Sequence, residues 1–188
     1  MNIFKAKHIN KLIILLIFQV VFASFVNKTF AQQYSEYELK AAYIYNFGKF
    51  VKWPEKSLKK EFIIGVYGLN PFKGILKEAL SGRTLYGKPI KIIYFSDLKN
   101  IEKCNILFIP KVKKEELLRI LNAVKNYPVL TVGDNIEDFC ISGGNINFTP
   151  KYSKYRFYIN NNSAKRKKLK ISSKLLSLSK IITDEIKF

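Results

Sequence analysis

Few side chains of this sequence could carry out acid–base or nucleophilic chemistry. The chain has 188 residues and one histidine, His8, which lies inside a leader-like segment, residues 1–31. The rest of the chain therefore lacks the usual general base near neutral pH and the commonest metal ligand. Ser-His and Cys-His nucleophile pairs and histidine-based zinc sites are excluded. We expect no catalytic residues, no metal and no cofactor.

The acids and glycines show no catalytic or nucleotide-binding pattern either. Asp134, Glu137 and Asp138 cluster in a predicted loop, where they would be solvated. Gly143-Gly144 precedes a predicted strand, so it indicates a turn or a bulge rather than a phosphate-binding loop. We predict that the protein is not an enzyme.

Two cysteines remain as candidates for redox chemistry, Cys104 and Cys140. In an oxidising compartment they could form one disulfide. They could equally lie apart as small buried apolar side chains. The sequence does not supply the Cα separation that decides between the two.

The stretch AAYIYNFGKFVKWP, residues 41–54, contains the most unusual grouping of polar and aromatic residues. It predicts a helix that ends near Lys52, because Pro54 disfavours helical geometry at Trp53. Most of its aromatic residues fall on one broad apolar arc at 100° per residue. Asn46 also lies within that arc, so its amide either bonds to a neighbouring loop or faces a pocket. Lys49 lies at the border of the arc, where a lysine can snorkel to solvent.

Two further basic groups are candidates for binding. Arg156 lies in the aromatic run YRFYIN, and an arginine can hold a carboxylate or a phosphate with two parallel bonds. The alternative for Arg156 is an exposed strand-face arginine paired with an acid. The run KRKK, residues 165–168, is typical of a solvated basic stretch, although it could steer docking to an acidic receptor or a membrane.

The N-terminus resembles a secretory signal. Lysines precede a 15-residue apolar run, Leu12–Val26, and small residues lie at the third-last and last places before Gln32. The run is short of the roughly 20 residues that span a bilayer, although an uncleaved anchor is the alternative. We therefore expect export to the periplasm and one domain, residues 32–188. That part has 29 basic and 14 acidic residues, a net charge of +15. It favours anionic neighbours, although AT-rich codon usage could also raise the lysine count.

The remaining sequence alternates predicted strands and helices. We expect strands at residues 61–68, 88–95, 105–110 and 128–133, and helices at residues 70–80 and 113–126. Runs at residues 143–150 and 154–160 show a hairpin pattern, and a long amphipathic helix is predicted over residues 162–187. Such alternation indicates an α/β fold, a three-layer α/β/α sandwich. Its sheet should be mixed and mainly parallel, with a late antiparallel hairpin.

Eight segments, taken in order, resemble the YfiR-like family of bacterial periplasmic regulatory proteins. They are AAYIYNFGKFVKWP, FIIGVYGLNPF, LYGKPIKI, CNILFIP, PVLTVGD, FCISGGNINF, YRFYIN and LKISSKLLSLSKI. The resemblance implies a regulator that binds the extracytoplasmic part of a membrane diguanylate cyclase and keeps it inactive, which controls cyclic-di-GMP and biofilm formation. Other members accompany sensor kinases. Arg156 matches the family's R-F-x-I-N motif, but Tyr158 stands where the best-known member has histidine.

We therefore expect a periplasmic regulator of a membrane-bound diguanylate cyclase or sensor kinase, not an enzyme. The alternative is a small-anion-binding module with a pocket near Asn46 and Arg156. Exposed aromatic residues of helix 36–52 and the hairpin 145–160 are the expected contact surface. The candidate binding residues are Asn46, Lys49, Trp53, Arg156 and Tyr158. A homodimer and an anionic envelope component are further candidate partners, and we expect no nucleic-acid binding.

Overall fold

The computed structural model describes residues 36–150, 153 and 156–183. The chain divides into two compact units, Met1–Lys40 and Ala41–Phe188. Of the first unit only residues 36–40 are described, and they are helical. The predicted leader, residues 1–31, lies outside the described residues. None of the described helices combines the length and apolar character that a bilayer crossing requires.

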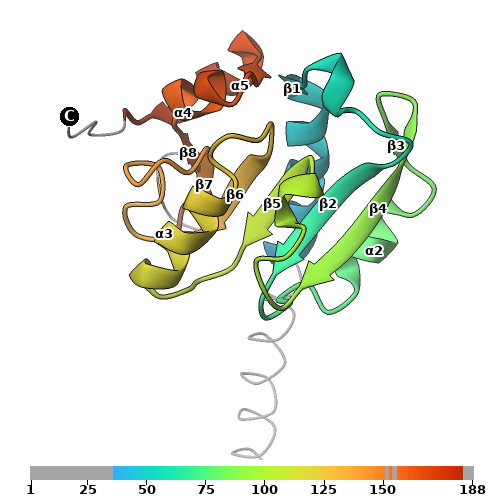
Figure 1. The fold of residues 1–188 in the computed structure, drawn as a ribbon, viewed down its shortest axis with the longest axis horizontal. Helices are drawn as coiled ribbons and strands as arrows, with labels where there is room; N and C mark the ends of the chain where they lie inside the picture. Colours follow the sequence, from blue (N-terminus) through green and yellow to red (C-terminus); the bar gives the residue numbers. More distant parts are fainter. Residues whose placement is uncertain (1–35, 151–152, 154–155, 184–188) are drawn as a thin grey trace, which may run out of the picture. The chain divides into compact units, whose positions relative to one another are not determined.

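The second unit is built on an eight-stranded sheet in the order β10-β8-β7-β6-β5-β2-β4-β3 (Figure 1). The strands are β2 Phe62–Tyr67, β3 Thr84–Leu85, β4 Lys88–Phe95, β5 Ile106–Ile109, β6 Leu130–Asp134, β7 Ile146–Phe148, β8 Phe157–Ile159 and β10 Lys180–Ile181. Neighbours pair in parallel except β3 with β4 and β7 with β8. The predicted mixed, mainly parallel sheet and its late antiparallel hairpin are confirmed.

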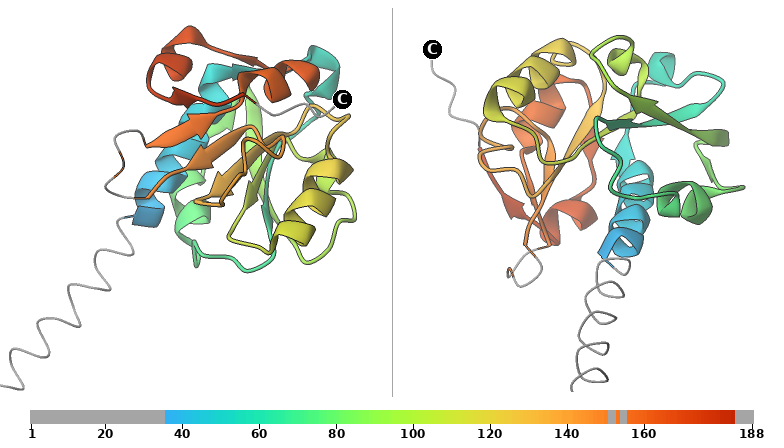
Figure 2. Two further views of the ribbon diagram at one scale, coloured as in Figure 1. Left: turned by 90° about the vertical axis from the view of Figure 1, so that its left-hand side faces the viewer. Right: turned by 90° about the horizontal axis from the view of Figure 1, so that it is seen from below.

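Helices cover both faces of this sheet (Figure 2). Residues 41–50, the part of the first helix in this unit, and α2 (Ile75–Leu80) lie on one face. Helix α3 (Lys114–Ala123) and the 3-10 turn η2 (Ile101–Lys103) lie on the other. The expected α/β fold is thereby confirmed, and its layers follow the alternation of strands and helices along the chain.

Side chains of the central strands alternate between two apolar cores. On β5, Leu107 and Ile109 face α3 and pack with its residues Leu117, Ile120 and Leu121. The adjacent Phe108 points the other way, and its ring centroid lies 4.8 Å from that of Phe72. Strand residues i and i+2 share a face, which explains why every residue of β5 is buried.

The first helix is slightly shorter than predicted, and it buries Ile44 and Phe47 of the predicted apolar arc. It ends at residue 50, and β1 (Val51–Lys52) pairs antiparallel with β9 (Lys170–Ile171). Gly48 is buried and faces Leu85 of β3. The short β3–β4 hairpin, which the sequence pattern did not predict, covers that side of the helix. On the other side Phe47 packs against Phe148 and Phe157.

The prediction of one long helix over residues 162–187 is wrong for the residues that the structure describes. Instead, α4 (Asn161–Arg166) and α5 (Ser173–Ser177) are separated by β9 and followed by β10. Lys168 has a φ of 61°, a left-handed conformation that ends a helix. The Ser172 hydroxyl then accepts a hydrogen bond from the Leu175 backbone N–H and starts a new helix.

Candidate functional site

The described residues carry no arrangement that suggests a metal centre. Nowhere in the described ranges do three or more His, Cys, Asp or Glu residues come together as a metal would need. Asp134 ends β6 and is buried, whereas Glu137 and Asp138 are exposed in the following turn. Cationic, aromatic and hydrogen-bonding side chains do line hollows of the described structure.

The hollow nearest the predicted site is a groove at the end of the first helix, here called the Trp53 groove. Its volume is about 680 Å³. It is lined by residues from the helix end, β1, the 3-10 turn η1 (Glu55–Ser57) and the β3–β4 hairpin, namely Tyr45, Lys49, Lys52, Trp53, Glu55, Leu58, Thr84, Leu85 and Tyr86. The end of the first helix and the β3–β4 hairpin, which are more than 30 residues apart in the sequence, thus line one recess.

Trp53 is held at the base of this groove by two aromatic rings. Its centroid lies 5.1 Å from that of Phe62 and 6.0 Å from that of Tyr86, both in edge-to-face geometry. Tyr86 has a φ of 55° at the hairpin turn, and its hydroxyl donates to the carbonyl of Val51. Burial raises the pKa of Tyr86. The hairpin is therefore tied to β1, and this contact closes one side of the groove.

The indole N–H of Trp53 has no hydrogen-bond partner among the described residues. The side chain is only 6% exposed, and Nε1 itself is buried. A buried donor left unsatisfied costs roughly 1–3 kcal/mol. Buried polar groups are nearly always satisfied, so an exception requires an explanation. A binding partner that brings an acceptor to this wall would supply one.

Positive charge and aromatic rings dominate the rim of the groove. Lys49 and Lys52 are exposed. The Tyr45 ring lies beneath two cations, with the Arg83 guanidinium carbon 4.9 Å and the Lys49 ammonium 5.7 Å from its centroid. Glu55 is the acid that lines the recess. Such a surface suits a ligand or protein segment that presents carboxylate or carbonyl oxygens.

The structure brings together some of the predicted binding residues and separates others. Lys49 and Trp53 share the groove, and Asn46 is half-buried on the same helix. Arg156 is exposed just before β8, and Tyr158 is half-buried on β8. Phe157, next to Tyr158, faces Phe47 of the helix. Tyr158 therefore lies on the opposite face of the sheet, where it packs against the α3 core.

Tyr158 lines a second, smaller hollow of about 380 Å³ beside the turn that follows β6. The ammonium of Lys180 lies 5.7 Å from the Tyr158 ring centroid. A pocket that combines Asn46 with Arg156 is not among the hollows described here, so a site built from both stays a prediction.

Both cysteines are free and buried in the structure, and the candidate Cys104–Cys140 disulfide is not formed. They lie in the same α3-side core, where burial raises the pKa of each thiol to about 12. A thiol with such a pKa is almost entirely protonated near neutral pH and is a poor nucleophile. As placed here, the cysteines act as core side chains.

Sequence reasoning missed one basic residue of structural interest, Lys167. It was read as part of a solvated KRKK run, but it is only 6% exposed, whereas Lys165, Arg166 and Lys168 are exposed. The signal that could have found it is spacing, because Ser163, Ala164 and Lys167 recur at helical intervals and are all buried. Lys167 belongs to a buried hydrogen-bond network with Asn145 and Val129.

The model of a family described as YfiR/HmsC-like matches residues 37–180, most of the chain. No curated protein matches the chain.

Proposed function

Because the chain belongs to the YfiR/HmsC-like family, we propose that it is a periplasmic regulator of cyclic-di-GMP signalling and not an enzyme. In this proposal it binds the extracytoplasmic part of a membrane signalling protein, a diguanylate cyclase or a sensor kinase. Binding holds that receptor in its inactive state, and release lets its output rise. Family membership supports the class of function, and the leader-like residues 1–31 support export.

The Trp53 groove is the proposed contact surface. Its observed features are the exposed lysines 49 and 52 and the unsatisfied indole N–H of Trp53. We infer that the receptor presents an acidic segment whose carboxylate meets the lysines. Tyr86 packs edge-to-face on the Trp53 ring and is 40% exposed, and we infer that its displacement on binding gives a receptor carbonyl access to the indole N–H. Binding would then satisfy a donor that the free protein leaves unpaired.

Regulation by such binding requires a preference between two receptor states. A protein that binds both states equally shifts nothing, however tightly it binds. To move a receptor from 99% active to 99% inactive, it must bind the inactive state about 10⁴-fold more tightly. The shape of the groove would provide this preference if the acidic segment fits it in only one receptor conformation.

The sequence left open a second function, the binding of a small anion near Asn46 and Arg156. The described residues favour a different place for an anion, around Lys167, and that site is independent of the receptor groove.

The proposed function is tested in the bacterium that encodes the protein. We expect deletion of the gene to raise cyclic-di-GMP several-fold, as measured by mass spectrometry, and the wild-type gene to restore it. The doubly reversed variant Lys49→Glu/Lys52→Glu should fail to restore it. The control Lys73→Glu/Lys77→Glu carries the same charge change on exposed lysines near α2 and should restore it fully. Equal cyclic-di-GMP in all strains would contradict the proposal.

A further inference from the structure

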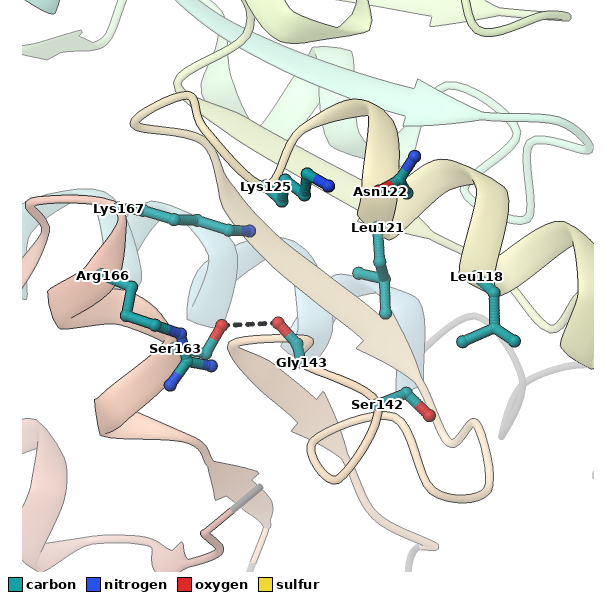
Figure 3. Close-up of a pocket in the computed structure, with 9 residues that line it drawn as sticks. All are labelled: Leu118, Leu121, Asn122, Lys125, Ser142, Gly143, Ser163, Arg166 and Lys167. Atoms are coloured by element: carbon teal, nitrogen blue, oxygen red, sulfur yellow. Dashed lines mark hydrogen bonds between the residues drawn. The ribbon is translucent and has the colours of Figure 1, made fainter. Parts of the chain in front are cut away.

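Lys167 is a buried cation without a described counter-charge. It follows α4, and its side chain extends toward α3 (Figure 3). Its ammonium donates two long hydrogen bonds, 3.4 Å to the carbonyl of Val129 and 3.3 Å to Oδ1 of Asn145. No carboxylate of the described residues forms an ion pair with it. An ammonium has three donors, so at least one remains for another partner.

The neighbouring network fixes this ammonium without neutralising it. Asn145 Oδ1 already accepts from the backbone N–H and the hydroxyl of Thr131, at 2.9 and 3.0 Å. Asn145 Nδ2 donates to the Ser163 hydroxyl at 3.0 Å, and that hydroxyl donates to the carbonyl of Gly143 at 2.5 Å. The partners that the described residues offer Lys167 are neutral, and Asn145 Oδ1 is shared among three donors. Within the described part of the chain, this charge is therefore held in place without an opposite charge beside it.

Two hollows meet at Arg166 and Lys167. The first, of about 380 Å³, is drawn in Figure 3 and is lined by Leu118, Leu121, Asn122, Lys125, Ser142, Gly143, Ser163, Arg166 and Lys167. The second is a groove of about 760 Å³ whose charged lining residues are Lys56, Lys59, Glu102, Lys103, Arg166, Lys167 and Lys168. Among the described residues, six cations and one acid line the second hollow, and three cations without an acid line the first.

We propose that Lys167, together with Arg166 and Lys125, binds the oxyanion group of a small molecule. The group is a carboxylate, a phosphate or a sulfate. Arg166 lines both hollows, and a guanidinium can bind such a group through two parallel bonds. The buried ammonium of Lys167 adds a charge that solvent screens little. The apolar part of the ligand would lie against Leu118 and Leu121 of α3. This site is built from α3, α4 and the loop before β7, and it shares no lining residue with the Trp53 groove.

The proposed site should respond to pH near neutrality. Burial, and secondarily the charge of Arg166, lower the pKa of Lys167 to about 7. The charged groups that face it are Arg166 and Lys168 from its own segment, Lys125 after α3, Lys56 and Lys59 near η1, and Glu102 and Lys103 of η2. Because an anion favours the protonated ammonium, binding should be tighter at pH 6 than at pH 8.5.

The test is titration calorimetry on the protein purified from the periplasm, with sulfate and benzoate as separate probes. Both probes keep a constant charge between pH 6 and pH 8.5, so any change in affinity reports on the protein. We expect saturable binding of at least one probe at pH 6 and several-fold weaker binding at pH 8.5. Sulfate binding alone would indicate a phosphate-like group, and benzoate binding would indicate a carboxylate. Either result supports the proposal.

Three variants locate the binding. Lys167→Met should weaken it about tenfold and remove its pH dependence, as expected for loss of one charged hydrogen bond. Lys125→Met alters an exposed side chain and should weaken binding a few-fold without disturbing the fold. Lys77→Met removes the same charge from α2 and should leave the affinity unchanged. The proposal is overturned if neither probe binds at pH 6, or if all three variants bind as the wild type does.

Discussion

Two buried hydrogen-bond donors in different parts of the same unit differ in what they lack: one has no acceptor, and the other has no opposite charge among the described residues. The indole N–H of Trp53 is neutral and has no partner in the described structure. The ammonium of Lys167 has two neutral acceptors but no described opposite charge. The indole N–H can be satisfied only by an acceptor from a binding partner. The ammonium of Lys167 can also lose its proton, because its pKa is lowered to about 7. Substitution of Trp53 should therefore show an effect that does not depend on pH, whereas the effect of substituting Lys167 should change with pH.

The largest expected effect is that of Lys167→Met on stability. The folded pKa of Lys167 lies below its unfolded value of 10.5, so below pH 7 both states hold the proton and the fold bears the cost of burying it. Between pH 7 and about 10.5 only the unfolded state holds it, and wild-type stability rises with pH. At pH 6 we therefore expect Lys167→Met to be more stable than the wild type, with a free energy of unfolding higher by on the order of 1–4 kcal/mol.

Urea denaturation at pH 6 and pH 9.5 measures this difference. The advantage of Lys167→Met should shrink at the higher pH, while Lys77→Met should track the wild type at both values. An advantage that is constant with pH would show that the ammonium of Lys167 is solvated and that its region does not differ from an ordinary surface.

A matched pair of glycine substitutions compares the packing of the two regions. A Cβ on Gly144, which precedes Asn145, would lie 2.2 Å from the ring of buried Phe139. We expect Gly144→Ala to destabilise by about 2–3 kcal/mol, because a buried ring cannot move aside freely.

Gly48, behind the Trp53 groove, is the other half of that pair. Its added Cβ would lie 2.4 Å from Cδ1 of Leu85, the flexible end of a side chain. Alanine also favours the helix by up to about 1 kcal/mol, so Gly48→Ala should cost about 1 kcal/mol or less. Thermal or urea denaturation of both variants measures the two losses of stability. A larger loss for Gly48→Ala than for Gly144→Ala would contradict the expectation that the region around Gly144 is the more rigidly packed.

The smallest expected effect on stability is that of Trp53→Phe. The substitution removes an unsatisfied donor, which is favourable by about 1–3 kcal/mol, and leaves a small void, which costs a similar amount. The free energy of unfolding should therefore change by less than about 1 kcal/mol. A loss of more than about 3 kcal/mol in urea denaturation would indicate that the indole N–H has a partner in the folded protein.

Much of the fold could be predicted from local patterns. The strands that became β2, β4, β5 and β6 are apolar runs with clear boundaries, and the β7–β8 hairpin follows from two runs close in sequence. The C-terminal helix prediction failed because an amphipathic stripe does not reveal a break at Lys168, which has a φ of 61° and is followed by the fully buried Leu169. Tertiary packing overrode the periodicity there.

The candidate site was predictable only in part. Trp53-Pro54 marked the end of the first helix, and Lys49 and Trp53 do share a groove. The other wall of that groove comes from Thr84, Leu85 and Tyr86, and no local pattern linked that hairpin to the helix. Helical spacing to Ser163 and Ala164 could have separated Lys167 from its neighbours in KRKK, but its partners Asn145 and Val129 are far from it in sequence and could not be predicted.

The central claim, that this protein binds a membrane signalling protein through the Trp53 groove, is tested most directly by photocrosslinking in living cells. A photoreactive phenylalanine analogue replaces Tyr45 in the groove or, as a control, Tyr94, which is 46% exposed on β4. We predict that position 45 crosslinks to an inner-membrane protein with a cyclase or kinase output domain, and that position 94 does not. Crosslinks to such a protein from position 94 alone, or from neither position, would contradict the account.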